Sequence, residues 1–175
     1  IFFLTLQLVI IIEINKRINI FFMSKYYLEF YNNLVKLSRN KDLYKDFKAS
    51  DEFSDRLIFF LIHFAFFFKI FKNEDNRVTL QEIYDFTFRQ LELSIREIGY
   101  GDQSINKKMK DYLNLFHKMI DQFHFWDDYD YNKKNEELGK FIKKSENTSN
   151  LLEYFEDYLS MLKKKHFKFL FKKCN

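Results

Sequence analysis

The sequence contains no proline, only three glycines and a single cysteine among its 175 residues. Glycine and proline form many of the tight turns of β-hairpins, so their scarcity disfavours a β-sheet protein. The single cysteine, Cys174, excludes both an internal disulfide and a metal site built from several cysteines. We therefore expect helices joined by short polar connections, in a reducing compartment.

Apolar residues are abundant and recur at helical spacing. Hydrophobic residues make up 47% of the chain and charged residues 31%, a balance typical of a folded protein. A chain of this length fits one domain with its own core. The spacing predicts an all-α fold, a single bundle-like domain of about six helices. We expect these helices at residues 24–38, 52–72, 79–98, 104–125, 136–144 and from 151 onward.

The second predicted helix contains the sequence FSDRLIFFLIHFAFFFKIF, which is apolar around nearly its whole circumference. Such a helix belongs in a protein core or in a membrane. Its apolar stretch, residues 57–68, is shorter than the roughly 20 residues needed to cross a bilayer. We expect the central, buried, Phe-rich helix of the domain, with His63 hydrogen-bonded inside the core or, alternatively, in a contact role.

The first 22 residues differ from the rest. The run IFFLTLQLVIII is too short to span a membrane and lacks the charged leader and cleavage site of a signal peptide. Met23 then begins a segment that has the character of an ordinary domain start. Residues 1–22 are either upstream sequence translated in error or a short membrane-surface anchor, and residues 23–175 are the expected domain. Mass spectrometry of the native N-terminus distinguishes these alternatives.

Two signals bound the third helix. Thr79 and Glu82 have the spacing of a capping box, which predicts a helix start. Gly99 is placed to end the helix, because glycine readily takes the left-handed conformation common just past a helix end. Gly99 and Gly101 occupy one turn, which is either a structural corner or a partner-binding corner.

Basic residues gather at the C-terminus. Beyond Asp157 there are six lysines and no acid, whereas the whole chain has a net charge of only +4. These lysines are Lys163, Lys164, Lys165, Lys168, Lys172 and Lys173. Interleaved with aromatic residues, they could bind anionic lipid or ribosomal RNA, each contributing about 1 kcal/mol at an anionic membrane. The alternative is a solvated helix end whose lysines favour the helix dipole.

The sequence motifs give little support for a catalytic site or a metal site. His117, Asp121 and His124 share a helix face, but a carboxylate-bridged di-iron site would also need Glu-x-x-His pairs, which are absent. Gly99 to Asp102 lacks the strand and the third glycine of a nucleotide-binding loop. No nucleophile lies in a recognisable setting. We expect no metal, no cofactor and no enzymatic activity.

Two blocks of sequence are similar to a known family. They are Phe53-Ser54-Asp55-Arg56-Leu57 leading to Leu61-Ile62-His63-Phe64, and Ile95-Arg96-Glu97-Ile98-Gly99-Tyr100-Gly101-Asp102-Gln103-Ser104 with Lys107 to Lys110. In this order and spacing, over about residues 25–170, they resemble the ubiquinol-cytochrome c chaperone family.

The resemblance implies a helical, non-enzymatic assembly factor for the cytochrome bc complex, respiratory complex III, that attends newly made cytochrome b. It also implies peripheral contact with the membrane, contact with the ribosome, and a small partner subunit; specific DNA binding is not expected. The expected location is the bacterial cytoplasm at the inner face of the membrane, or the matrix side of the mitochondrial inner membrane in a eukaryote. A generic helical adaptor, or an RNA- or ribosome-binding module acting through the basic C-terminus, is the alternative.

The resemblance also suggests where a client protein would bind. We expect the client surface to be formed or framed by residues of the two blocks and the lysines that follow them. These residues are Arg56, His63, Arg96, Glu97, Gly99, Gly101, Asp102, Lys107, Lys108 and Lys110.

Overall fold

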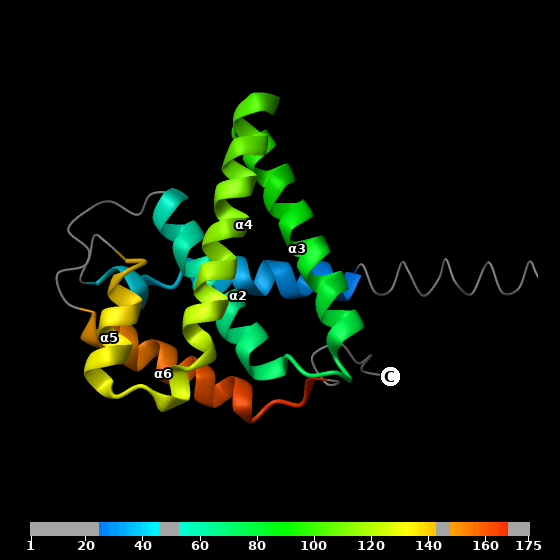
Figure 1. The fold of residues 1–175 in the computed structure, drawn as a ribbon. Helices are drawn as coiled ribbons and strands as arrows, with labels where there is room; N and C mark the ends of the chain where they lie inside the picture. Colours follow the sequence, from blue (N-terminus) through cyan, green and yellow to red (C-terminus); the bar gives the residue numbers. More distant parts are fainter. Residues whose placement is uncertain (1–24, 46–52, 143–147, 168–175) are drawn as a thin grey trace, which may run out of the picture.

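The computed structural model describes residues 25–45, 53–142 and 148–167, and these ranges contain helices and no strands (Figure 1). A first helix covers residues 25–38 and is followed by the short 3-10 helix η1 (Lys41–Tyr44). The remaining elements are α2 (Phe53–Phe71), α3 (Arg77–Glu97), α4 (Asp102–His124), η2 (Trp126–Asp128), α5 (Tyr131–Gly139) and α6 (Ser149–Lys163). The predicted all-α fold is confirmed.

Helix α2 is the centre of the core, as its composition predicts. Every residue from Phe59 to Phe67 is buried, and α2 packs against both α4 and α6. Phe66 stacks on Phe123 of α4, with ring centroids 4.3 Å apart, and lies 5.6 Å from the ring of Phe155 of α6. Offset aromatic pairs of this kind add to the energy of simple burial. One aromatic side chain therefore joins three helices.

The first helix packs across α3 through tyrosines. Tyr27 and Tyr31 are buried, and their hydroxyls bond to side chains of α3: Tyr27 donates to Glu82 Oε2 at 2.6 Å, and Tyr31 Oη lies 3.1 Å from Ser94 Oγ. Burial and the adjacent Glu82 carboxylate raise the pKa of Tyr27 well above its ordinary value. The hydroxyls therefore remain protonated and hold the first helix against α3.

The predicted start of α3 is wrong. The helix begins at Arg77, two residues before Thr79, and Glu82 accepts the Tyr27 hydroxyl. Asn76 fixes the start instead: its side chain donates to the carbonyl of Phe71 at 3.0 Å, and its own carbonyl accepts the Leu80 amide at 2.8 Å. The predicted end is confirmed, because α3 stops at Glu97 and Gly99 has φ +98°.

The boundaries of the last two helices also differ from expectation. Helix α5 begins at Tyr131, inside the predicted polar connection, because the carboxylate of Asp130 accepts the Lys133 amide at 2.7 Å and caps the helix. Helix α6 begins at Ser149 and ends at Lys163. Of the helices that the structure describes, none combines the length and apolar character needed to cross a bilayer. Residues 1–22 lie outside the described residues.

Candidate partner-binding site

Most of the predicted client-contact residues meet at the turn between α3 and α4. We call residues 93–110 the hairpin tip; in Figure 1 the upper turns of α3 and α4 extend beyond the other helices. The tip contains eight of the ten predicted residues, all except Arg56 and His63: Arg96, Glu97, Gly99, Gly101, Asp102, Lys107, Lys108 and Lys110. The fold therefore gathers the second sequence block and its lysines into one place.

The turn itself depends on local backbone chemistry. Gly99 takes the left-handed conformation, φ +98°, which a residue with a side chain adopts only at a cost. The chain then enters α4 through Gly101, whose carbonyl accepts the Ile105 amide at 3.0 Å and the Ser104 hydroxyl at 2.7 Å. Gly101 has an ordinary φ of −72°. Only Gly99 needs to be glycine for conformational reasons.

Arg96 joins the two sides of the turn. Its guanidinium donates to Glu92 of the same helix at 2.8 Å and to Asp102 at the start of α4. The hydrogen bonds to Glu92 and then Asp102 raise the pKa of Arg96 above its ordinary value. Because both carboxylates engage one guanidinium, the charges of Glu92, Arg96 and Asp102 partly neutralise each other and stabilise the corner.

The lysines of the tip, unlike Arg96, form no ion pair with the described residues. Lys107 and Lys110 are exposed and form no ion pair with any described residue, including Asp111, one turn further along α4. The Lys108 ammonium lies 4.6 Å from the ring centroid of Tyr100, a cation–π contact. Cations in the first turns of a helix gain nothing from its dipole, which favours anions there. The contacts of the fold therefore do not explain why lysine occupies positions 107 and 110.

The hairpin tip also carries exposed apolar side chains. Leu93 is 45% exposed, Ile98 54% and Tyr100 40%. Beneath them the hairpin is closed by Ile95 and Ile105, both fully buried. The tip thus combines a firm packed interior with an outer surface that is both apolar and basic.

His63 lies elsewhere, completely buried between α2 and α6. Its Nδ1 lies 2.6 Å from the Phe59 carbonyl, so Nδ1 carries the proton and donates. Its Nε2, 3.0 Å from the hydroxyl of Tyr154 on α6, then accepts. Burial lowers the pKa of His63 to about 4, so the ring is neutral near pH 7. The predicted hydrogen-bonded core histidine is confirmed.

A contact role for His63 or Arg56 stays a prediction. Arg56 is half-buried near the start of α2, two turns from His63. The partners that the structure gives the His63 ring are Phe59 and Tyr154, so the ring needs no help from Arg56. Neither residue belongs to the hairpin tip, residues 93–110.

The basic C-terminus is described only in part. Lys163 donates to Asp127 at 3.0 Å, and Lys69 pairs with the same carboxylate at 2.9 Å. These lysines lower the pKa of Asp127, Lys69 contributing most. Lys164 and Lys165 are exposed, whereas Lys168, Lys172 and Lys173 lie outside the described residues. One of the predicted surface lysines, Lys163, therefore forms an ion pair within the protein, which links the end of α6 to η2.

The predicted histidine face does not assemble a metal site within the described ranges, where no three His, Cys, Asp or Glu side chains are placed to hold an ion. His117 Nε2 lies 3.0 Å from the Tyr84 hydroxyl, and the two rings stack. This contact joins α3 to α4. His117 is therefore part of the packing between these helices.

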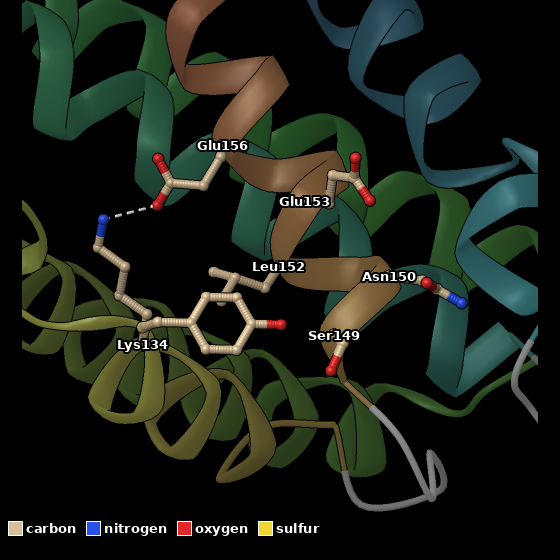
Figure 2. A pocket seen from close by; sticks show the side chains of 7 residues that line it. Lys134, Ser149, Asn150, Leu152, Glu153 and Glu156 are labelled. Atoms are coloured by element: carbon tan, nitrogen blue, oxygen red, sulfur yellow. Dashed lines mark ion pairs between the residues drawn. The ribbon is translucent and has the colours of Figure 1, made fainter.

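A shallow groove of about 390 Å³ lies between α5 and α6 (Figure 2). Its lining residues are Tyr131, Lys134, Ser149, Asn150, Leu152, Glu153 and Glu156. Lys134 pairs with Glu156 at 2.8 Å, and Glu156 also accepts the Trp126 indole N–H at 2.9 Å. Sequence reasoning missed this groove, because placing α5 at residues 136–144 leaves Tyr131 and Lys134 in a loop.

Comparisons with known proteins agree with this architecture. Residues 45–124 match the family model described as ubiquinol-cytochrome C chaperone, and this stretch contains α2, α3 and α4. The crystal structure of the Cbp3 homolog from Brucella abortus superimposes with a TM-score of 0.69 at 22% sequence identity, covering 92% of each chain. No curated protein sequence matches this chain. The resemblance inferred from the sequence is confirmed: residues 45–124 are similar to the ubiquinol-cytochrome C chaperone family.

Proposed function

We propose that this protein is an assembly chaperone for the cytochrome bc complex, which binds newly made cytochrome b and catalyses no reaction of its own. The observation that carries the proposal is the family match over α2, α3 and α4, the helices that form the centre of the core and the hairpin tip. The fold shared with the Cbp3 homolog from Brucella abortus supports it.

The hairpin tip is the surface that we assign to the client. It presents both exposed apolar side chains, of which Ile98 is the most exposed, and the exposed lysines 107 and 110. A membrane protein that has not yet reached its final place exposes apolar helices flanked by charged loops. A surface of mixed apolar and basic character can cover both features. Peripheral membrane contact, a ribosome contact and a small partner subunit belong to the same proposal, at the inner face of the bacterial membrane or its mitochondrial counterpart.

The alternative, an RNA- or ribosome-binding module acting through the C-terminal lysines, has less support. Of the three described lysines in that cluster, Lys163 is already paired with Asp127. Binding to RNA would depend steeply on salt concentration, because each neutralised phosphate releases counterions. Such salt-sensitive RNA binding, lost when Lys164 and Lys165 are changed to glutamine, would favour the alternative.

Deletion of the gene tests the proposal directly. We expect cells without the protein to accumulate less cytochrome b, measured from the haem b absorbance of their membranes, and less assembled cytochrome bc complex on native gels. The wild-type gene should restore both. Normal levels of cytochrome b and of the complex in the deletion strain would contradict the proposal.

Charge reversal tests the place of the client surface. The variant K107E/K108E/K110E should fold, because none of the three lysines is buried, yet restore much less assembled complex than the wild type. A matched control is K36E/K72E/K118E, which makes the same change in net charge at three exposed lysines outside the tip. Equal amounts of assembled complex with the two variants would show that the client does not bind at the tip.

A further inference from the structure

The groove between α5 and α6 is too small for a folded partner and suits a short segment of chain (Figure 2). A groove of about 390 Å³ holds only a few side chains. Among its lining residues, Leu152 is buried and Tyr131 is 57% exposed. The groove therefore offers an apolar contact that the protein leaves open.

The groove also presents a carboxylate without a partner. Glu156 is held by Lys134 at 2.8 Å and by the Trp126 indole at 2.9 Å. Glu153 is exposed and forms no ion pair with any described residue, and no dashed line reaches it in Figure 2. Asp157, one turn further along α6, is likewise exposed and unpaired in the described part of the chain. Like charges four residues apart destabilise a helix slightly, so the stability of α6 does not explain these two acids.

These acids belong to an acidic part of the sequence. Residues 126–163 contain nine acidic and six basic residues, although the whole chain has a net charge of +4. Residues 164–175, by contrast, contain five lysines and no acid. Because opposite charges attract across an interface, the groove favours a cationic occupant.

The C-terminal segment, residues 168–175, has the chemistry that this groove suits. Its sequence is KFLFKKCN, in which three lysines accompany three large apolar residues. The segment lies outside the described residues and follows Phe167, whose ring packs 5.4 Å from that of Phe71 at the end of α2. The point from which the segment leaves the described fold is therefore known.

The segment is poorly placed for the groove of its own chain. From Asn150, in the groove, to Lys163, at the end of α6, the helix rises about 20 Å, and Phe167 follows four residues later. In Figure 1 the red end of the described chain lies away from α5. Eight residues span at most roughly 28 Å when fully extended, so the segment would have to run straight back along α6. A segment from another copy has no such limit.

We propose that the α5–α6 groove binds residues 168–175 of a second copy of this chain, with a lysine on Glu153 and an aromatic ring against Tyr131 and Leu152. When two copies exchange this segment, each makes the same contact, so the arrangement closes as a symmetric dimer. The proposal does not rest on the chaperone function, because the purified protein alone tests it. Failure of the dimer would leave the chaperone function standing, and the reverse.

Sedimentation velocity over a concentration series tests the proposal. The full chain should form a dimer that weakens with added salt, because the contact is partly ionic. The variant E153K should weaken the dimer roughly tenfold, since an exposed ion pair is worth up to about fivefold and the dimer contains two. D121K makes the same change in net charge at an exposed residue of α4 and should dimerise like the wild type. A monomer at all concentrations, or equal dimerisation of E153K and D121K, would overturn the proposal.

Exchanging the charges identifies the two contacting parts. K172E/K173E should also weaken the dimer. A mixture of E153K with K172E/K173E should restore it, because the acidic segment of one chain then meets the new lysine in the groove of the other, while the remaining groove and segment keep their natural charges. A mixture that stays monomeric would show that the segment does not meet Glu153.

Disulfide trapping separates contact between copies from contact within one. Cys174 is the single cysteine and lies in the segment. When E153C/C174S is mixed with the wild type and oxidised with diamide, which takes up the two thiol hydrogens, a disulfide should join the introduced cysteine to Cys174 of the other chain. A non-reducing gel and mass spectrometry of the linked peptides detect it. K118C/C174S, with its cysteine on exposed α4 surface, is the control and should give little. In E153C, a disulfide formed within single chains would place the segment in its own groove and overturn the exchange.

Discussion

The imidazole of His63 is buried where α2 meets α6, and both of its nitrogens are hydrogen-bonded. Nδ1 donates to Phe59, and Nε2 accepts from Tyr154. The ring also makes edge-to-face contacts with Phe155 and Tyr158. Protonation of Nε2 would place a charge among aromatic rings, and the Tyr154 hydroxyl would have to turn so that its oxygen accepts instead of donating. The site therefore favours the neutral ring.

This geometry predicts a pH dependence of stability. The folded pKa of about 4 lies below the ordinary value of 6.5, so the unfolded chain binds the proton more readily. The contribution of His63 is complete above pH 6.5 and is lost as the pH falls toward 4, by about 3 kcal/mol in total. Urea unfolding between pH 7 and 5, above the range in which carboxylates titrate, should show the first part of this loss.

Substitution identifies the group responsible. H63Q removes the titration, so its free energy of unfolding should change less between pH 7 and 5 than that of the wild type, whatever its value at pH 7. Identical slopes for H63Q and the wild type would show that another group causes the loss.

At the scale of the element, the α3–α4 hairpin depends on one backbone conformation. Gly99 and Gly101 lie two residues apart in the same exposed turn, and an added Cβ would meet no atom within 4 Å at either position. They differ in φ, which is +98° at Gly99 and −72° at Gly101. The two glycines therefore form a natural pair in which steric contact is constant and only conformation varies.

We expect G99A to lower the free energy of unfolding by about 1 to 2 kcal/mol, the cost of a left-handed conformation for a residue with a Cβ. G101A should cost less, up to about 1 kcal/mol, because alanine suits φ −72° but is a poorer N-cap residue for α4 than glycine. Chemical denaturation of the two variants beside the wild type measures both effects. Equal values for G99A and G101A would mean that the turn does not need the left-handed residue.

For the whole molecule, the described core begins at Tyr27. The first helix contributes Tyr27, Tyr31 and Leu34 to that core, and half-buried Phe30 packs against Phe67 with ring centroids 4.5 Å apart. These contacts bring the first helix, α2 and α3 together. The domain boundary that we propose, residues 23–175, keeps all of them.

A chain that begins at Met23 should therefore keep the helical circular dichroism and the unfolding midpoint of the full chain. A chain that begins at Asn32 is the comparison, because it loses Tyr27, Phe30 and Tyr31. It should unfold at a lower midpoint by several degrees or more, since the loss of several buried aromatic side chains costs several kcal/mol. A large loss of stability in the chain from Met23 would place part of residues 1–22 within the fold.

Local signals predicted much of this architecture. A helix apolar on all sides has to be buried, and α2 is; a glycine after a long amphipathic stripe ends that helix, and Gly99 does. The start of α3 was misplaced because the Thr79 and Glu82 pattern is also compatible with the middle of a helix. The Asn76 side chain fixes the start through the Phe71 carbonyl, a contact that depends on how the preceding loop folds back.

The sequence by itself determined the helical class, the buried central helix, the glycine turn and the family resemblance of residues 45–124, because each rests on spacing or on a motif within one segment. Only the tertiary structure decided which distant side chains meet. Tyr27 bonds to Glu82 and His63 to Tyr154 across separations of 55 and 91 residues, and no pattern along the chain specifies such pairs. The exposed lysines and apolar side chains of the hairpin tip likewise could be identified only from the structure. The structure shows which other charges form ion pairs and which other apolar side chains are buried.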